Sequence, residues 1–284
     1  MPDYELVQLA NGVWSVRSLA ESETFHPVVG PVQEARTLYV EQTRLPERIE
    51  RANREFVIWD VGLGAAANVL TLLDAVPKQS RKKIRILSFD HTLKPLEFAI
   101  EHAGKLDYPK LFLAELSALA RERTVEFRRD ALKVRWNVFV ADFPMLLASS
   151  DAWSWPKPDA ILFDAFSPAK NPAMWTLSLF TRLFELLDPA RPCAMPTYSR
   201  STMLRVTLLL AGFYVGIGKA IAEKEETTIA ANDLSLIESP LNENWLRRAR
   251  NSTCAEPLRG PVYTRAPLSE QTFAALKRLP QFRS

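Results

Sequence analysis

Residues 56–70 read FVIWDVGLGAAANVL, and this stretch decides the fold. It opens with an apolar run over residues 56–60, which is typical of a strand buried on both faces of a sheet. Gly62 and Gly64 follow at once, and the alanine-rich segment over residues 65–76 favours a helix. Strand, glycine turn and helix in direct succession predict the start of a βαβ unit.

The chain downstream repeats this alternation of strands and helices. An apolar strand over 84–89 ends in Asp90, and strict alternation over 124–141 predicts a hairpin whose second strand ends at Asp142. A fourth strand is expected over 159–164. We therefore expect an α/β fold with a doubly wound, mostly parallel sheet and one antiparallel strand near its end. The remaining strands are expected at 193–198, 213–217 and 226–231.

The N-terminal segment has a different pattern and is predicted to form a small cap. Alternating apolar and polar residues over 5–16 flank Asn11-Gly12, a turn signal for a β-hairpin. A helical spacing of apolar residues then begins at Pro31. The predicted division of the chain is a cap over 1–50, a core over 51–241, and a short helix with a proline-containing tail over 242–284.

The composition is that of an ordinary globular protein, with 47% hydrophobic and 24% charged residues among 284. No apolar stretch approaches the roughly 20 residues that a membrane helix needs, so we expect no membrane partner. Asp3 stands where a secretory signal would carry positive charge, which favours the cytoplasm. The spacing of Cys193 and Cys254 fits neither a zinc site nor a disulfide framework, so no metal is expected.

The net charge of +3 is only weakly basic, but several basic residues are clustered. Such clusters can bind nucleic-acid phosphates, although solvated helix ends and loops explain them as well. The basic clusters are Arg81-Lys82-Lys83, Arg128-Arg129, Lys133 with Arg135, and Arg247-Arg248 with Arg250.

Glycines and acidic residues mark the carboxyl ends of the predicted strands, where α/β proteins bind their ligands. Gly62 and Gly64 would let backbone N–H groups approach a nucleotide or nucleoside, and the absence of a Gly-Lys-Ser/Thr sequence argues against a P-loop. Asp90 can accept hydrogen bonds from both hydroxyls of a ribose, and Asp142 can accept one from the exocyclic amine of adenine. Each aspartate taken alone could instead cap a turn or a helix.

The segment after the fourth strand, residues 164–175, reads DAFSPAKNPAMW. It places Asp164 at a strand end where a substrate must lie. A carboxylate at this position can hold an amine by a charge-assisted hydrogen bond and help remove its proton. In the alternative interpretation, Asp164 caps the next helix and Trp175 is a core residue.

These stretches resemble the methyltransferase half of the MnmC family of bifunctional tRNA-modifying proteins. Residues 164–175 are similar to that family's DGFAPAKNPxMW signature, and residues 60–71 are similar to its ELGFGTGLNFLT. Weaker similarity extends the match over roughly residues 30–235. The resemblance implies a class I methyltransferase fold, which is Rossmann-like, with S-adenosyl-L-methionine as the methyl donor.

The resemblance also implies an acceptor and a set of site residues. The acceptor would be the primary amine of 5-aminomethyl-(2-thio)uridine at the wobble position of the tRNA anticodon, with Asp164 as the catalytic residue. The family's second half, an FAD-dependent oxidase, does not fit within 284 residues, so no flavin is expected. The donor-binding candidates are Gly62 and Gly64 beside the methionine part, Asp90 at the ribose, and Asp60, Asn68 and Asp142. The substrate-binding candidates are Phe166, Lys170, Asn171 and Trp175.

Several positions depart from the family pattern, among them Ala66, Ala165 and Asp60 in place of its glutamate, and alternatives stay open. Ala66 stands at the third glycine of the turn and need not block the donor, because a Cβ is tolerated where φ stays negative. Ala165 replaces the glycine after the catalytic residue that the resemblance implies. The acceptor could be a different amine or base, or the chain could be a non-catalytic module that binds the donor. A dehydrogenase is disfavoured because His26, His91 and His102 show no catalytic arrangement, and His26 is expected at the surface.

Overall fold

The computed structural model describes residues 3–221 and 225–283. The described chain divides into two compact units, each with its own internal contacts. The cap, core and tail expected from the sequence remain a prediction. The first unit contains residues 3–143, 160–164 and 221, and the second contains residues 144–159, 165–220 and 225–283.

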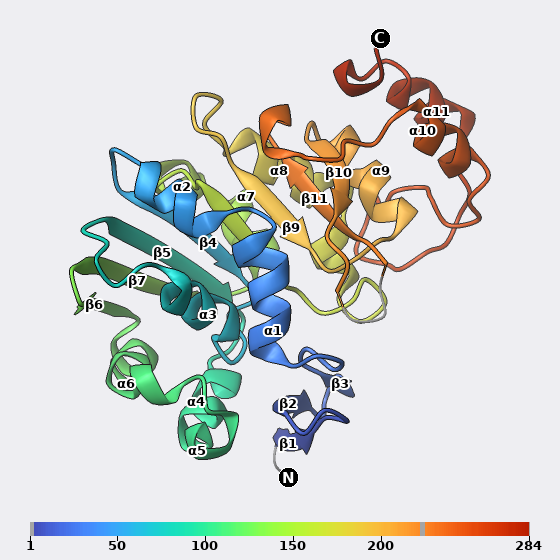
Figure 1. The fold of residues 1–284 in the computed structure, drawn as a ribbon. Helices are drawn as coiled ribbons and strands as arrows, with labels where there is room; N and C mark the ends of the chain where they lie inside the picture. Colours follow the sequence, from blue (N-terminus) through green and yellow to red (C-terminus); the bar gives the residue numbers. More distant parts are fainter. Residues whose placement is uncertain (1–2, 222–224, 284) are drawn as a thin grey trace. The chain divides into compact units, whose positions relative to one another are not determined.

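A small antiparallel sheet begins the first unit (Figure 1). The hairpin predicted around Asn11-Gly12 is confirmed, and Gly12 has the positive φ of 81° that suits such a turn. Trp14 and Phe25 pack with Ala65 of the glycine turn in one hydrophobic cluster. The strands, each antiparallel to the next, are β1 (Tyr4–Gln8), β2 (Trp14–Ser18) and β3 (Glu23–Thr24).

Five further strands of the first unit form a sheet in the order β8-β4-β5-β7-β6. The first four are parallel, and β6 is antiparallel to β7, as the predicted hairpin requires. All residues of β4 and β8 are buried, which agrees with their continuous apolar sequence. These strands are β4 (Phe56–Val61), β5 (Lys83–Asp90), β6 (Thr124–Arg129), β7 (Leu132–Val140) and β8 (Ala160–Phe163).

The helices of the first unit alternate with these strands. Helix α3 begins directly after the glycine turn and packs against α1 and against η1, a π-helix. These helices are α1 (Pro31–Ala35), η1 (Arg36–Glu41), α2 (Leu45–Arg51), α3 (Ala67–Ala75), α4 (Lys94–Glu101), α5 (Ala103–Leu106), η2 (Lys110–Phe112) and α6 (Leu113–Glu122).

The second unit contains three strands, in which β11 pairs antiparallel with both β9 and β10. This confirms the antiparallel strand expected near the end of the sheet. The guanidinium of buried Arg205 on α9 donates to the hydroxyl of Thr228 and to the carbonyl of Thr227, which ties α9 to β11. The strands are β9 (Ala194–Thr197), β10 (Tyr214–Gly218) and β11 (Thr227–Ala231). The helices are α7 (Phe143–Ala148), which starts at the boundary, η3 (Ser150–Ser154), η4 (Pro172–Trp175), α8 (Leu177–Glu185), α9 (Thr202–Leu210), η5 (Leu234–Leu236), α10 (Glu243–Arg250), α11 (Glu270–Leu276) and η6 (Pro280–Phe282).

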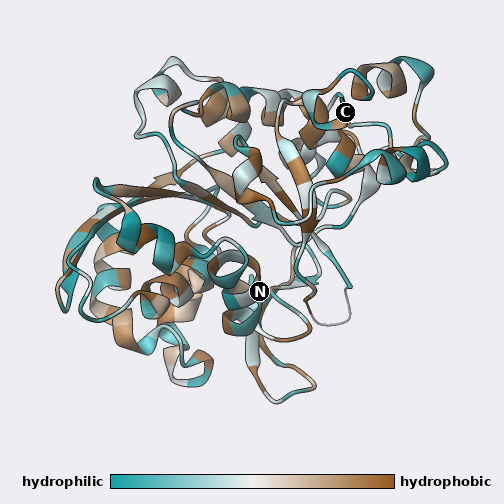
Figure 2. Cartoon of the chain, turned by 45° about the horizontal axis from the view of Figure 1, so that its top comes forward, coloured by the Kyte–Doolittle hydropathy of each residue, from teal (hydrophilic) through white to brown (hydrophobic). Residues whose placement is uncertain are grey.

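The predicted α/β class with a mostly parallel sheet and an N-terminal hairpin is confirmed. In Figure 2 the strands are largely hydrophobic, whereas the helices carry both hydrophilic and hydrophobic residues. The sheet therefore supplies much of the core. Across residues 3–221 and 225–283, no helix combines the length and the hydropathy that crossing a membrane requires.

Candidate active site

The glycine turn after β4 is held against the end of β5. The N–H of Gly62 donates to the carbonyl of Phe89 at 2.9 Å, and the N–H of Gly64 donates to Oδ2 of Asp90 at 2.9 Å. Both glycines have positive φ, 92° and 51°, which glycine adopts without strain. A Cβ on Gly64 would lie 3.4 Å from the ring of Phe25, so a side chain there would narrow the turn.

The backbone of Ala66 does not meet the condition under which alanine is tolerated at this position. Its φ is +63° rather than negative. The N–H of Ala66 donates to the carbonyl of Leu63 at 2.8 Å, closing a tight turn immediately before α3. The geometry of this turn places an alanine in the left-handed region, where its Cβ approaches backbone atoms closely.

Asp164 follows β8 and is anchored through both its main chain and its side chain. Its N–H donates to the carbonyl of Val61 in the neighbouring strand β4 at 2.9 Å. Nδ2 of Asn68, in the first turn of α3, donates to Oδ2 of Asp164 at 2.8 Å. Oδ1 of Asn68 is buried and has no hydrogen-bond partner in the described part of the chain. A buried acceptor of this kind suits a hydrogen-bond donor on a ligand.

His26, expected at the surface, lies beside Asp164 instead. Its Nε2 is 3.6 Å from Oδ2 of Asp164, and its Nδ1 is 3.4 Å from Oε1 of Glu34. The side chain is only 10% exposed, so the prediction of a surface role is wrong. The loop after β3 is fixed by a hydrogen bond from the N–H of Phe25 to the carbonyl of Val16 at 2.8 Å. No local periodicity encodes this path, which is why neither His26 nor Glu34 could be identified from sequence spacing.

The imidazole of His26 is influenced by opposing effects. Burial lowers the pKa of His26, but the carboxylates of Asp164 and Glu34 outweigh burial and leave the pKa raised. The charged imidazolium is therefore favoured in the folded protein.

Asp60 is a buried carboxylate near the carboxyl end of β4. Oγ of Ser88 donates to its Oδ2 at 2.7 Å, and Nε1 of Trp136 donates to Oγ of Ser88 at 2.8 Å. Burial raises the pKa of Asp60 to about 7; Ser88 opposes this rise, whereas Asp164 and Asp90 add to it. The carboxyl ends of β4, β5 and β8 thus form an acidic cluster suited to cationic groups.

The ribose and adenine candidates also follow strand ends. Asp90 accepts at Oδ1 from the N–H of Thr92 at 3.3 Å and lies 3.1 Å from Nδ1 of His91. Each carboxylate oxygen can accept more than one hydrogen bond, so Asp90 keeps capacity for ligand hydroxyls. Asp142 is exposed and lies two residues beyond the end of β7. Both positions agree with the predicted strand ends, and their roles stay predictions.

The four substrate-binding candidates lie in the second unit. Trp175 is fully buried, and its Nε1 donates to the carbonyl of Phe166 at 2.8 Å. The N–H groups of Lys170 and Asn171 both donate to the carbonyl of Ser167, at 2.9 and 2.8 Å. Lys170 is exposed, and Phe166 and Asn171 are partly exposed. Trp175 therefore shapes the loop from within, whereas the other three are accessible to a ligand.

The structure brings together two pairs of predicted residues, Gly64 with Asp90 and Asn68 with Asp164. The buried, unpartnered acceptor of Asn68 suits a ligand with a hydrogen-bond donor, such as an ammonium group. Within the described ranges, no group of three or more His, Cys, Asp or Glu side chains is arranged to hold a metal ion.

Comparison with known proteins finds similarity to methyltransferases. Residues 108–233 match a family model described as S-adenosyl-L-methionine-dependent methyltransferase. The chain is similar along 98% of its length to the crystal structure of MNMC2 from Aquifex aeolicus, with a TM-score of 0.69 and 24% identity over 84% of that chain. This likeness supports the Rossmann-like fold.

Two curated relatives carry the name tRNA 5-methylaminomethyl-2-thiouridine biosynthesis bifunctional protein MnmC. The protein from Methylibium petroleiphilum is 29% identical over 228 residues, which are 78% of this chain and 34% of the relative. The protein from an Azoarcus species is 30% identical over 204 residues, which are 70% of this chain and 31% of the relative. The chain thus spans about a third of the length of these relatives.

Proposed function

We propose that this chain, which is an S-adenosyl-L-methionine-dependent methyltransferase related to the MnmC proteins, methylates the primary amine of 5-aminomethyl-(2-thio)uridine at the tRNA wobble position. The observation that carries the proposal is Asp164, a partly buried carboxylate at the end of β8 that Asn68 holds in place. The names of the relatives support the choice of acceptor.

The acidic cluster favours an amine as the acceptor. The first unit contains the carboxylates of Asp60, Asp90, Asp164 and Glu34. The charges of Asp164 and Asp90 help to raise the pKa of Asp60. Such a cluster attracts cations, including a sulfonium donor and an ammonium acceptor, and it repels anionic acceptors. An aminomethyl group, protonated in water at neutral pH, therefore matches this site.

The donor-binding residues of this proposal lie along the glycine turn and the strand ends. When bound, S-adenosyl-L-methionine supplies an electrophilic methyl group on a sulfonium. Gly62 and Gly64 keep the turn open for the methionine part, and Asn68 offers its unpartnered Oδ1 to the ammonium. Asp90 would accept hydrogen bonds from the ribose hydroxyls, and Asp142 would accept one from the adenine amine. Asp60, near the end of β4, completes the proposed set of donor-binding residues.

Asp164 is the proposed catalytic residue. It would bind the acceptor ammonium by a charge-assisted hydrogen bond and accept one proton, which exposes the nitrogen lone pair. Asn68 prevents the carboxylate from rotating, since its Nδ2 binds Oδ2 at 2.8 Å. Fixed orientation matters because in-line transfer requires the nitrogen to face the methyl group directly.

The loop over residues 165–175 is the proposed receptor for the extruded uridine. Phe166 would stack on the base, and Lys170 and Asn171 would bind the base or its phosphate. Trp175 would support Phe166 through the hydrogen bond to its carbonyl. Methyl transfer involves no electron transfer, so the proposal includes neither flavin nor metal, and it places the chain in the cytoplasm with its tRNA.

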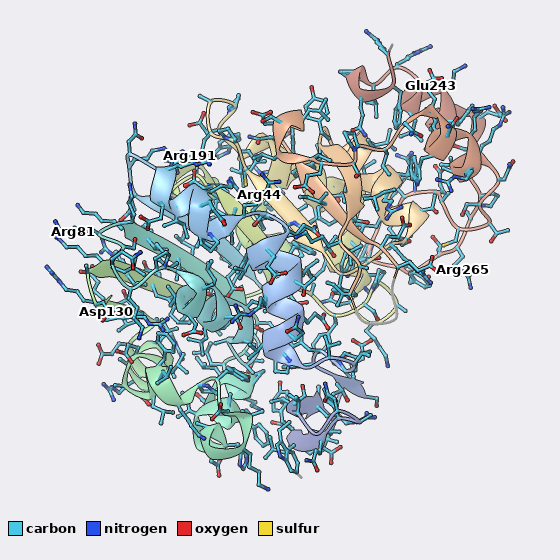
Figure 3. All side chains as sticks on the ribbon, viewed as in Figure 1. Arg44, Arg81, Asp130, Arg191, Glu243 and Arg265 are labelled. Atoms are coloured by element: carbon cyan, nitrogen blue, oxygen red, sulfur yellow. The ribbon has the colours of Figure 1, made fainter. Side chains whose placement is uncertain are left out.

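A row of three cations offers a surface for tRNA phosphates. Lys83 on β5 lies opposite Lys133 on β7, which in turn lies opposite Arg128 on β6. We call these three residues the basic row. All are exposed, and like charges directly opposite on a sheet destabilise it, so a polyanion would relieve the repulsion. Figure 3 labels two residues near the basic row in the sequence: Arg81, just before β5, and Asp130, in the turn between β6 and β7.

Mass spectrometry of nucleosides tests the proposed reaction. Unmethylated tRNA that carries 5-aminomethyl-(2-thio)uridine, incubated with the chain and the donor, should gain one methyl group on that nucleoside. D164N should lower the rate about a hundredfold or more while calorimetry detects unchanged donor binding. D107N, at an exposed aspartate in the same unit, serves as the control and should retain the wild-type rate. Methylation of free polyamines but not of tRNA would replace the proposed acceptor with a small amine.

A further inference from the structure

Outside the donor-binding turn, a row of three largely buried ionisable side chains ends at Asp164. His26 stands between two carboxylates, with Glu34 3.4 Å from its Nδ1 and Asp164 3.6 Å from its Nε2. The three side chains are 10%, 13% and 16% exposed for His26, Glu34 and Asp164, respectively. Because 3.6 Å exceeds the length of a hydrogen bond, the interaction of His26 with Asp164 is mainly one of charge.

Glu34 determines which way the imidazole faces. Glu34 stands in the first turn of α1, and α1 packs against α3, the helix that carries Asn68. A carboxylate beside Nδ1 favours a proton on that nitrogen and leaves Nε2 facing Asp164. Oδ2 of Asp164 is thus approached by Asn68 from α3 and by His26 from the loop after β3.

The acidic cluster creates a difficulty for Asp164. Neighbouring carboxylates disfavour one another's ionisation, and Asp60 responds to the charge of Asp164. A carboxylate that must take a proton from an ammonium has to be ionised beforehand. A cation beside Asp164 would satisfy this requirement.

We infer that His26 is the positioning residue for Asp164: its imidazolium, held by Glu34, keeps the carboxylate ionised and oriented toward the acceptor amine. This inference rests on the proposed function, since it takes Asp164 as the group that receives the amine. One proton passes from the acceptor ammonium to Asp164 and from there to solvent. His26 keeps its proton throughout, so no further co-reactant is needed.

The charge of His26 can be measured without any acceptor. The charged groups in contact with its ring are Glu34 on α1 and Asp164 after β8, and Asp60 and Asp90 belong to the same cluster. In an NMR titration of the whole chain, we expect the pKa of His26 to lie above its ordinary value of about 6.5. E34Q and D164N should each lower it. A wild-type pKa at or below the ordinary value would overturn the inference.

The pH profile of methyl transfer tests what that charge does. H26Q keeps a side-chain donor but removes the charge, so the acid limb of kcat/KM should move upward by about one to three pH units. Near pH 6.5 the loss should be about tenfold or more, while the KM for the donor stays within about twofold of wild type. A loss of rate that is uniform across pH would make His26 a structural support and contradict the inference.

Two controls separate this inference from the proposed function. H102Q changes a histidine of the same unit whose ring centroid lies 4.3 Å from that of Phe98. This variant should keep the wild-type pH profile of kcat/KM. Should H26Q not fold by circular dichroism, the E34Q titration tests the same ion-pair chain. If the wild-type chain methylates no tRNA amine, the proposed function fails, whereas the NMR titration still decides whether His26 is charged beside Asp164.

Discussion

Asp60 lies at the buried end of β4, where burial raises the pKa of its carboxyl from an ordinary value of 3.8 to about 7. Between these two values the unfolded chain releases a proton that the folded chain retains. The contribution of Asp60 to stability is therefore fully present below about pH 3.8 and is lost as pH rises through about 7.

D60N should remove this pH dependence. Wild type should lose up to about 1.4 kcal/mol of unfolding free energy per pH unit from this position across the window, and the variant should not. Urea unfolding of both proteins between pH 4.5 and 7.5 measures the difference between their unfolding free energies. The variant should become more stable relative to wild type as the pH rises. A difference that is constant with pH would mean that Asp60 is ionised in the folded protein.

The positions of individual site residues could be predicted from the sequence where those residues directly follow a recognisable strand. Asp90 and Asp164 were located because the apolar strands before them are easily recognised, and both lie at the predicted edge. The positive φ of Ala66 belongs to a local turn closed on the carbonyl of Leu63, whereas His26 was mispredicted because its loop is held by a more distant contact, between Phe25 and Val16. A single sequence contains no signal for contacts of this range.

At the scale of elements, the π-helix η1 is tied to β8, the strand that precedes Asp164. Tyr39, in the middle of η1, is fully buried, and its hydroxyl donates to the carbonyl of Phe163 at 3.0 Å. Phe163 directly precedes Asp164, so this hydrogen bond fixes the backbone from which the proposed catalytic carboxylate projects. π-Helical turns often occur at functional sites, which agrees with this placement.

Y39F should loosen that attachment. The lost hydrogen bond should lower the free energy of unfolding by about 1 kcal/mol, and kcat should fall while donor affinity is retained. Chemical denaturation and steady-state kinetics measure the two effects. Y263F, at an exposed tyrosine of the tail, is the matched control and should change neither quantity. A wild-type kcat in Y39F would show that η1 supports the fold without positioning Asp164.

Elements differed in how well their sequence patterns identified them. The strands β4, β5, β7 and β8 were predicted to within two residues because apolar runs and strict alternation are characteristic of strands. Helix α9 was not predicted, because nearly all of its side chains are buried and it therefore lacks an amphipathic period. Its one charged residue, Arg205, is buried too and binds β11.

At the scale of the whole molecule, the charge is separated along the strands of the first unit. The carboxyl ends of β4, β5 and β8 carry the acidic cluster, whereas Lys83 and Lys133 stand near the starts of β5 and β7. A net charge of +3 conceals this separation, which is why composition alone was uninformative. The arrangement suits a substrate with a cationic reacting group and a polyanionic backbone.

Replacing the basic row should therefore weaken tRNA binding without affecting the donor site. In K83A/K133A/R128A we expect the Kd for tRNA to rise about tenfold or more near physiological salt, because each phosphate without its cationic partner keeps its counterion. The slope of log affinity against log salt should fall by about 0.9 for each such phosphate, while donor affinity stays unchanged. Filter binding over a salt series, with calorimetry for the donor, measures both quantities.

The matched control removes three other exposed cations of the same unit, in K105A/K110A/R121A. It changes the net charge by the same amount and leaves the basic row intact. If long-range attraction alone governed binding, both triple variants would weaken it equally, since the field depends on total charge. A selective effect of the basic row would instead require phosphates to contact these three side chains directly, which ties the starts of β5 and β7 to tRNA recognition.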